Sequence, residues 1–248
     1  MRVLVTGGTS GLGLAMATAL AAAGASVAVT GRDGGRAREV AATLPGEALG
    51  VALDVRDPAS VAAAVDRTWS ALGGVDMLVN NAGIGMRTVN PRFLTEPHGF
   101  WQVPVDGFRT VIETNLTGYF LVAREIAPRM LAAGHGRIVN ISVSHSTMQR
   151  AGFVPYGPSR AGSEALSRIM AADLRDTGVP VNVLLPGGAT VTGMLPPDAV
   201  PQNLPFLSPA VMGPPIVWLA SPEAADVHDE RIVAVDFERG LQERSSRR

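Results

Sequence analysis

The chain contains no cysteine and no lysine, so all 21 of its basic side chains are arginine. The absence of cysteine excludes disulfide bonds, thiolate metal ligands and a cysteine nucleophile. The absence of lysine excludes a Schiff base, a phosphate-loop lysine and a proton relay through an ammonium group. Any chemistry that depends on a positive side chain must therefore use arginine.

Long hydrophobic runs and strong net charge are also missing. No stretch of about 18 strongly apolar residues occurs, so we expect no membrane-spanning helix. The alanine-rich segment 15–25 is a poor signal peptide, because glycines interrupt the residues before it. The net charge of −1 offers no electrostatic basis for binding nucleic acid or acidic membranes, and the four histidines show no metal-ligand spacing. We therefore expect a cytoplasmic protein with none of these partners and no metal.

Short apolar runs alternate with alanine- and leucine-rich segments of helical spacing. The expected strands are Arg2–Thr6, Ser26–Thr30, Leu49–Asp54, Met77–Asn80, Arg137–Ser142, Val179–Leu185 and Arg231–Val235. The clearest expected helices are Gly13–Ala23, Ala59–Leu72 and Gly162–Leu174. This alternation predicts an α/β fold with a doubly wound, Rossmann-like parallel sheet flanked by helices. With no repeat or linker to divide the chain, we expect one domain over residues 1–240 and a flexible tail over 241–248.

Two proline-containing segments, 85–104 and 186–215, lack a helical period. Each follows the carboxyl end of an expected strand, where open α/β sheets place their ligand crevice. We expect them to be substrate loops, the alternative being ordinary connectors. Their apolar side chains, among them Phe93, Trp101, Met194 and Leu195, indicate an apolar small-molecule substrate.

A glycine-rich turn, Thr6–Gly13, joins the first expected strand to the first helix. Glycines allow a backbone to turn tightly and approach a pyrophosphate, whose charge is favoured at a helix N-terminus. The turn lacks the ending of a phosphate loop and the usual spacing of dinucleotide folds. The residues expected to bind a nucleotide here are Gly7, Thr9, Ser10, Gly11, Leu12 and Gly13.

Five features in order carry a family resemblance. They are T-G-x-x-x-G-x-G at Thr6–Gly13, N-N-A-G at Asn80–Gly83, a lone Asn115, Tyr156, and Pro186–Gly187. Together they resemble the classical short-chain dehydrogenase/reductase family over nearly the whole chain. The resemblance implies a bound nicotinamide dinucleotide, and its further contacts would be Asp54 and Val55 by the adenine, then Asn81, Ala82, Gly83, Pro186 and Gly187. Thr192 resembles the threonine that contacts the nicotinamide amide, and Thr190 is the alternative.

The residues after the second strand indicate which dinucleotide is used. A carboxylate at that place would bind the ribose 2′-hydroxyl of NAD and repel a 2′-phosphate. This chain has Gly31 there, followed by Arg32, whose guanidinium suits a phosphate. We therefore expect NADP(H) rather than NAD(H), the alternative being that Arg32 is a solvated loop charge and Asp33 caps the next helix.

In the family, a tyrosine exchanges the proton, a serine polarises the carbonyl, a lysine four residues after the tyrosine binds the ribose, and an asparagine holds a relay water. Tyr156 matches the tyrosine, whereas Tyr119 lies in an apolar-patterned helix and is expected to belong to the core. The lysine position holds Arg160. A guanidinium can stabilise a tyrosinate and bind ribose hydroxyls, but it does not readily release a proton, so weakened activity is expected.

The serine position departs from the family as well. Thirteen residues before Tyr156 the chain has Val143, flanked by Ser142 and Ser144. We favour Ser144 over Ser142 as the catalytic serine, the alternatives being that neither hydroxyl is catalytic or that His145 substitutes as a general acid.

Asn115 lies inside the helix-like stretch Val105–Met130. Asparagine is unfavourable within a helix, which predicts a local distortion there. The stretches Val105–Met130 and Pro155–Leu174 correspond to helices that family members pair between subunits, so the resemblance implies a homodimer or homotetramer.

The expected function is an NADP-dependent oxidoreductase, such as a ketoreductase, that moves a hydride between nicotinamide and a ketone or secondary alcohol through a Tyr-x-x-x-Arg site. One alternative is a nucleotide-binding sensor or regulator that lacks redox turnover. The other is a non-redox enzyme on the same fold.

Overall fold

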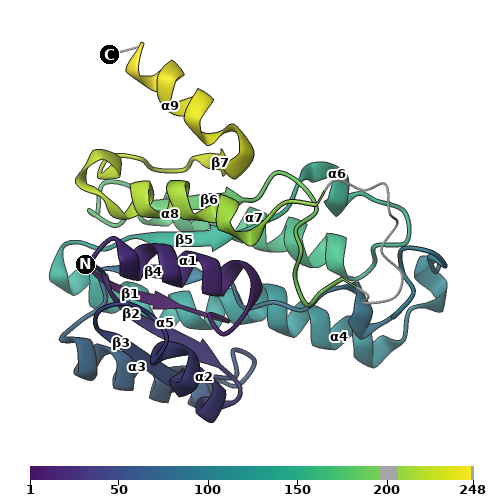
Figure 1. The fold of residues 1–248 in the computed structure, drawn as a ribbon. Coiled ribbons are helices and arrows are strands. Elements are labelled where there is room, and N and C mark those ends of the chain that lie inside the picture. Colours follow the sequence, from purple (N-terminus) through teal and green to yellow (C-terminus); the bar gives the residue numbers. More distant parts are fainter. Residues whose placement is uncertain (196–205, 247–248) are drawn as a thin grey trace.

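The computed structural model describes residues 1–195 and 206–246, and its strands form a parallel sheet (Figure 1). The strands are β1 (Arg2–Val5), β2 (Ser26–Gly31), β3 (Ala48–Ala52), β4 (Met77–Asn80), β5 (Ile138–Ile141), β6 (Val181–Leu185) and β7 (Arg231–Val233). Within the described residues their order is β3-β2-β1-β4-β5-β6-β7, and each neighbouring pair is parallel. The predicted doubly wound sheet is confirmed, and its topological switch point lies between β1 and β4.

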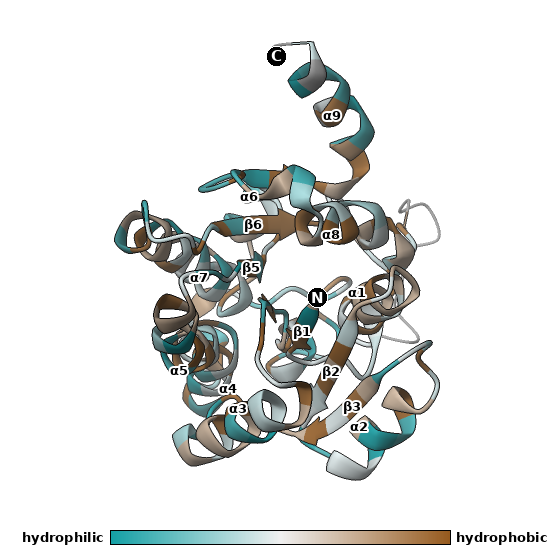
Figure 2. Ribbon diagram, turned by 90° about the vertical axis from the view of Figure 1, so that its left-hand side faces the viewer, coloured by the Kyte–Doolittle hydropathy of each residue, from teal (hydrophilic) through white to brown (hydrophobic). Residues whose placement is uncertain are grey.

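Helices cover both faces of the sheet (Figure 2). Their bounds are α1 (Gly11–Ala22), α2 (Gly34–Ala41), α3 (Pro58–Leu72), α4 (Val105–Ile112), α5 (Gly118–Ala133), α6 (His145–Met148), α7 (Tyr156–Asp173), α8 (Gly213–Ala220) and α9 (Phe237–Ser245). Apolar side chains of α1 and α8 pack on one face, and those of α3, α5 and α7 pack on the other.

Alternation along each strand supplies both cores. In β1, Val3 and Val5 pack toward α1 and α8, and Leu4 packs toward α3 and α5. Because both faces are covered, the strands are nearly continuous apolar runs, which is why the sequence marks them clearly. Strand boundaries differ from the expected ones by at most two residues. Helix α7 begins at Tyr156, six residues before the expected start, and this places Tyr156 and Arg160 in its first turns.

The two irregular segments contain short helical turns. Residues 85–104 hold 3₁₀ turns at Met86–Thr88 and Phe100–Gln102. In 186–215, Thr190 forms a bridge with Leu207, and a 3₁₀ turn covers Pro209–Met212. The central part of this second expected loop, residues 196–205, lies outside the described residues.

The C-terminal segment extends helix α9 away from the sheet (Figure 1). Arg244, in its last turn, forms an ion pair with Glu230 at 3.0 Å and lies over the ring of Trp218. The expected tail 241–248 therefore begins inside this helix, and residues 247–248 lie outside the described part. Over residues 1–195 and 206–246, no helix has the length and apolar character needed to cross a membrane.

Candidate nucleotide-binding and catalytic site

The glycine-rich turn is fastened to the carboxyl end of β4. The Thr6 hydroxyl accepts hydrogen bonds from the backbone amides of Asn81 (2.9 Å) and Ala82 (3.0 Å). The Asn81 side-chain amide donates in return to the carbonyls of Thr6 (2.9 Å) and Gly7 (3.1 Å). A methyl group at Gly13 would lie 2.3 Å from the Gly7 carbonyl oxygen, so this close approach requires glycine. The turn is thus a closely packed backbone surface at the switch point.

This turn fits a nucleotide pyrophosphate. Gly7 and Gly11 adopt φ values of +64° and +54°, which side chains disfavour. Ser10 caps α1 without a side-chain hydrogen bond to the helix amides, so the first amides remain available to an anion. A Cβ at Gly11 would lie 3.3 Å from the Thr192 methyl group, so Thr192 lies over the turn. The Thr190 hydroxyl donates to the Gly188 carbonyl at 3.2 Å, and the Thr192 hydroxyl accepts from the Met194 amide at 3.4 Å.

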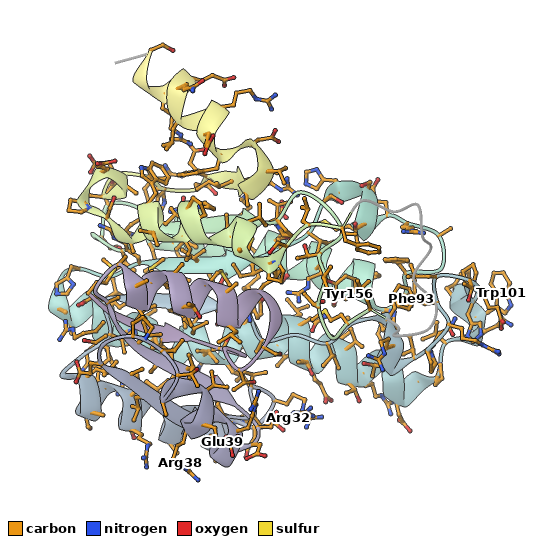
Figure 3. The ribbon with its side chains drawn as sticks, in the orientation of Figure 1. Arg32, Arg38, Glu39, Phe93, Trp101 and Tyr156 are labelled. Atoms are coloured by element: carbon orange, nitrogen blue, oxygen red, sulfur yellow. The ribbon has the colours of Figure 1, made fainter. Side chains whose placement is uncertain are left out.

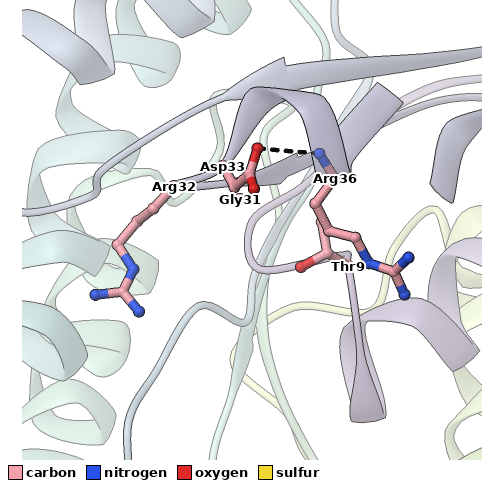
Figure 4. A pocket seen from close by; sticks show the side chains of 5 residues that line it. All are labelled: Thr9, Gly31, Arg32, Asp33 and Arg36. Atoms are coloured by element: carbon pink, nitrogen blue, oxygen red, sulfur yellow. Dashed lines mark hydrogen bonds between the residues drawn. The ribbon is translucent and has the colours of Figure 1, made fainter. Parts of the chain in front are cut away.

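An open pocket of about 530 Å³ lies beside the end of β2 (Figure 4). Thr9, Gly31, Arg32, Asp33 and Arg36 line it. The Asp33 carboxylate accepts hydrogen bonds from the amides of Gly35 (2.8 Å) and Arg36 (3.1 Å), and so caps α2 as the alternative interpretation expected. Arg32 is exposed and forms no ion pair within the described residues, while Arg36 has a weak partner in Glu39 at 3.4 Å. Two diverging guanidinium groups therefore make this pocket basic.

Asp54 lies two residues after the end of β3, near Arg32 of the basic pocket. The carboxylate forms an ion pair with Arg56 at 2.6 Å. The hydrogen bond from the Arg56 side chain and, more weakly, the charge of Arg32 lower the pKa of Asp54. Val55 is buried, and its side chain contacts the backbone of α5 at Gly118.

Tyr156 and Arg160 lie one turn apart on α7. Figure 3 shows Tyr156 at the carboxyl ends of the strands. The Arg160 residue is only 3% exposed. Its guanidinium carbon is 5.4 Å from the ring centre of Tyr156 and 5.6 Å from that of Tyr119. Nη1 donates to the Tyr119 hydroxyl at 2.8 Å and to the Ile141 carbonyl at 3.2 Å. A buried positive charge is therefore enclosed between the chain's two phenols.

The environment keeps this guanidinium charged. Burial alone would lower the pKa of Arg160, but its interactions with Tyr119 and Tyr156 raise it overall. Burial raises the pKa of Tyr119 above its ordinary value, although the nearby Arg160 charge opposes that effect. Tyr119 is thus a neutral phenol beside a permanent cation.

Asn115 connects the exit of β4 to α7. It lies in a π-helical turn, Glu113–Thr117, which confirms the distortion predicted within the long helix. Its amide oxygen accepts from the Ile84 amide at 2.9 Å, and its nitrogen donates to the Ile84 carbonyl (2.9 Å) and the Ser159 hydroxyl (3.0 Å). Ser159 donates in turn to the Tyr156 carbonyl at 2.8 Å. The asparagine therefore sets the position of the first turn of α7.

The two candidate serines have different partners. Ser142 is buried, and its hydroxyl donates to the Glu164 carboxylate at 2.7 Å. Strand β5 ends before it, and Ser144 caps the short helix α6, where its hydroxyl contacts those of Ser146 (3.0 Å) and Thr147 (2.9 Å). Ser142 donates to a carboxylate, whereas the Ser144 partners among the described residues are two hydroxyls and one backbone amide.

Glu164 lies at the centre of a polar network that the sequence did not indicate. Arg231, on β7, donates to the Glu164 carboxylate at 2.7 Å and to the Val143 carbonyl at 2.9 Å. His145 lies 3.4 Å from the same carboxylate. Burial raises the pKa of Glu164, but the hydrogen bonds from Ser142 and Arg231 outweigh it and lower the pKa below its ordinary value. This network draws Ser142 toward α7 and ties the loop after β5 to the edge of the sheet.

The expected substrate loops meet beside Tyr156. Met86, Phe93 and Phe153 form a buried apolar cluster against which Tyr156 packs, and Figure 3 shows Phe93 and Tyr156 at the same end of the molecule. The Arg87 guanidinium joins the two loops by donating to the Gly193 carbonyl at 2.8 Å.

Trp101, in contrast, is 76% exposed and lies farther out than Phe93 (Figure 3). The apolar wall near Tyr156 therefore comes from the inner part of the first loop and not from its tip.

Among the functional neighbours, Tyr119, Glu164 and Arg231 were not identified from the sequence. Tyr119 looked like a core residue because its helix has an apolar pattern. The available signal was the arginine four residues after Tyr156, because a buried guanidinium has five N–H donors and needs acceptors for them.

Comparison with known proteins agrees with this geometry. A family model described as short chain dehydrogenase matches residues 1–200. The chain is 33% identical over 232 residues to a 2,5-dichloro-2,5-cyclohexadiene-1,4-diol dehydrogenase from Sphingobium indicum, covering 89% of each chain. It is 33% identical to a 3-oxoacyl-(acyl-carrier-protein) reductase from Escherichia coli, covering 74% of this chain and 71% of that protein.

Solved structures give the same result. A 3-ketoacyl-(acyl-carrier-protein) reductase from Brucella melitensis, complexed with NADH, has a TM-score of 0.82 at 28% identity and covers 94% of this chain and 95% of its own. An actinorhodin polyketide ketoreductase with NADPH has a TM-score of 0.81 at 29% identity and covers 94% of each chain. The chain therefore belongs to the short-chain dehydrogenase/reductase family.

Proposed function

We propose that this chain is an NADP-dependent oxidoreductase that interconverts a ketone and a secondary alcohol. The observation that carries the proposal is the position of the Tyr156 phenol beside the buried Arg160 guanidinium. Both lie at the carboxyl edge of the sheet, where the glycine-rich turn fits a dinucleotide. When bound, the nicotinamide would supply or accept the hydride.

The chain's own groups would manage the proton and the carbonyl. Tyr156 gives a proton to the carbonyl oxygen during reduction and removes it during oxidation. Arg160 supplies a fixed positive charge beside the Tyr156 ring. Ser144 is our choice for orienting the carbonyl, because Ser142 donates its hydroxyl proton to Glu164. Asn115 holds the first turn of α7 in register with the exit of β4.

The basic pocket supports NADP(H) over NAD(H). Its carboxylate, Asp33, is occupied as a helix cap, so Arg32 and Arg36 are the groups that can meet a 2′-phosphate. Two guanidinium groups there would favour a doubly charged phosphate over a hydroxyl.

The apolar cluster around Tyr156 supports an apolar carbonyl substrate, since it removes competing water from one side of the phenol. We further propose that residues 1–240 form one catalytic domain in the cytoplasm, with substrate loops at 85–104 and 186–215. Exposed apolar side chains at Phe108, Phe120 and Ile169, on α4, α5 and α7, support pairing as a homodimer or homotetramer.

One observation favours a second candidate, a nucleotide-binding protein without redox turnover. Val143 occupies the family's serine position, and both flanking hydroxyls have partners within the chain. Such a protein would bind NADP(H) yet leave its absorbance unchanged with every carbonyl compound.

The experiment follows NADPH and NADH absorbance with a panel of apolar ketones. We expect turnover with NADPH that Tyr156→Phe abolishes without weakening NADPH binding. Arg32→Ala should raise the KM for NADPH by about tenfold, the effect of losing one charge-assisted contact, and should leave the KM for NADH unchanged. Arg38→Ala, which removes an exposed arginine of α2 outside the pocket, is the matched control. Binding without turnover would support the second candidate.

A further inference from the structure

Arg160 is a buried cation whose direct partners are neutral. It forms no ion pair with a carboxylate within the described residues, although buried charges normally have one. Within the described residues Nη1 donates to the Tyr119 hydroxyl and the Ile141 carbonyl, and the guanidinium also interacts with the Tyr156 phenol. The buried Nε has no hydrogen-bond partner in the described part of the chain. The placement of this charge therefore depends on few contacts, and each of them matters.

Tyr119 completes a closed triangle of hydrogen bonds around Nη1. Its hydroxyl accepts from Nη1 of Arg160 at 2.8 Å and donates to the Ile141 carbonyl at 3.1 Å, while Nη1 also reaches that carbonyl at 3.2 Å. All three groups are buried. Because the Ile141 carbonyl belongs to a strand and cannot move freely, these three hydrogen bonds fix the position of Nη1.

The other terminal nitrogen of the guanidinium, Nη2, is confined by the Gly83 backbone, on the side of the site where a cofactor would bind. Nη2 lies so close to Gly83 that a Cβ there would be 2.3 Å away. The Asn115 amide oxygen is 3.1 Å from the same point. With Nη1 anchored and Nη2 against Gly83, the guanidinium can lie only beside the Tyr156 ring.

We propose that Tyr119 is a positioning residue whose hydroxyl anchors Arg160 and thereby holds the guanidinium beside Tyr156. Phenylalanine would fill the same apolar space, so what Tyr119 adds is a hydroxyl that links Arg160 to the Ile141 carbonyl. Tyr119 and Arg160 thus act as a matched pair in place of the family's single lysine. This inference rests on the proposed function, in which Tyr156 exchanges the proton.

The test is a double-mutant cycle with Tyr119→Phe, Arg160→Lys and the double variant, read by steady-state kinetics. We expect Tyr119→Phe to lower kcat about tenfold, which is the loss of one hydrogen bond to a charged group. The KM for the ketone should stay within twofold, because the guanidinium acts beside the proton-exchanging group and not in substrate binding. The Kd for NADPH should stay within twofold. In the Arg160→Lys background, removing the Tyr119 hydroxyl should change kcat by less than about twofold.

Thr68→Val is the matched control. Thr68 is fully buried on α3, and its hydroxyl donates to the Ala64 carbonyl at 2.8 Å, far along the chain from the site. It should lower stability and leave kcat unchanged. Equal losses of kcat on removal of the Tyr119 hydroxyl from the unaltered chain and from the Arg160→Lys variant, or a change in the ketone KM with kcat unmoved, would overturn the proposal.

A second readout does not need turnover. Tyr119 and Tyr156 are the chain's two tyrosines, so in Tyr156→Phe the phenol absorbance reports Tyr119 alone. Adding Arg160→Gln should raise the pH at which that phenol ionises, because the Arg160 charge lowers the pKa of Tyr119. An unmoved titration would overturn the contact itself. Absent turnover by the unaltered chain, with a titration that does move, would instead refute the proposed function and leave the Tyr119–Arg160 contact supported.

Discussion

Replacing Gly83 with alanine should displace the buried guanidinium without disturbing the backbone. The added methyl would lie 2.3 Å from Nη2 of Arg160 and 3.1 Å from the Asn115 amide oxygen. Arg160 is the flexible partner, but moving it breaks its bonds to Tyr119 and Ile141. Overpacking of this kind costs about 1–3 kcal/mol. For a chain of this size, about 2 kcal/mol corresponds to a fall in Tm of roughly 4–8 °C.

The loss of activity should be larger than the loss of folded protein can explain, because the displaced group is the one that faces Tyr156. We expect kcat to drop at least tenfold in the NADPH assay, with Tm followed by differential scanning calorimetry. Gly240→Ala is the control, because a Cβ there meets no atom within 4 Å. Combining Gly83→Ala with Arg160→Lys should remove most of the loss in Tm, since lysine has no Nη2. Unchanged kcat and Tm in Gly83→Ala would refute the placement of the guanidinium.

Three further outcomes are expected. Glu164 has a lowered pKa in the folded state, so its stabilising effect is present above about pH 5 and is lost as the pH falls. In Glu164→Gln, the free energy of unfolding measured with urea should therefore depend less on pH on the acid side. An unchanged dependence on pH would contradict the Arg231 contact. Tyr119 has a raised pKa, so stability should fall as the pH rises above about 10, and Tyr119→Phe should lose that dependence in the same assay. Asn115→Ala removes three hydrogen bonds to Ile84 and Ser159, and should lower the free energy of unfolding by about 2–3 kcal/mol in denaturant titrations.

The sheet and the glycine-rich turn could be predicted from the sequence because local patterns determine them. Buried parallel strands are apolar runs, and β4 was predicted with its observed bounds, Met77–Asn80. The distortion at Asn115 was predictable because an amide inside a helix competes with the backbone for hydrogen bonds.

Contacts across long sequence separations were not accessible in this way. Ser142 follows β5, which ends at Ile141, and its partner Glu164 is also bonded by Arg231, which comes from β7. Tyr119 has the same apolar surroundings as a core residue, and only the fold shows that its hydroxyl lies 2.8 Å from Arg160. Side-chain direction at the site is decided by these distant partners, which no local period encodes.

The most direct measurement of hydride transfer uses NADPH carrying deuterium at both positions of the transferring carbon. A ketone accepted by the chain is reduced, and the alcohol is analysed by mass spectrometry. We expect one deuterium on the carbinol carbon for each NADPH consumed, and no labelled alcohol with Tyr156→Phe. NADPH that binds and remains fully labelled with every ketone offered, or alcohol formed without deuterium, would contradict the proposed oxidoreductase.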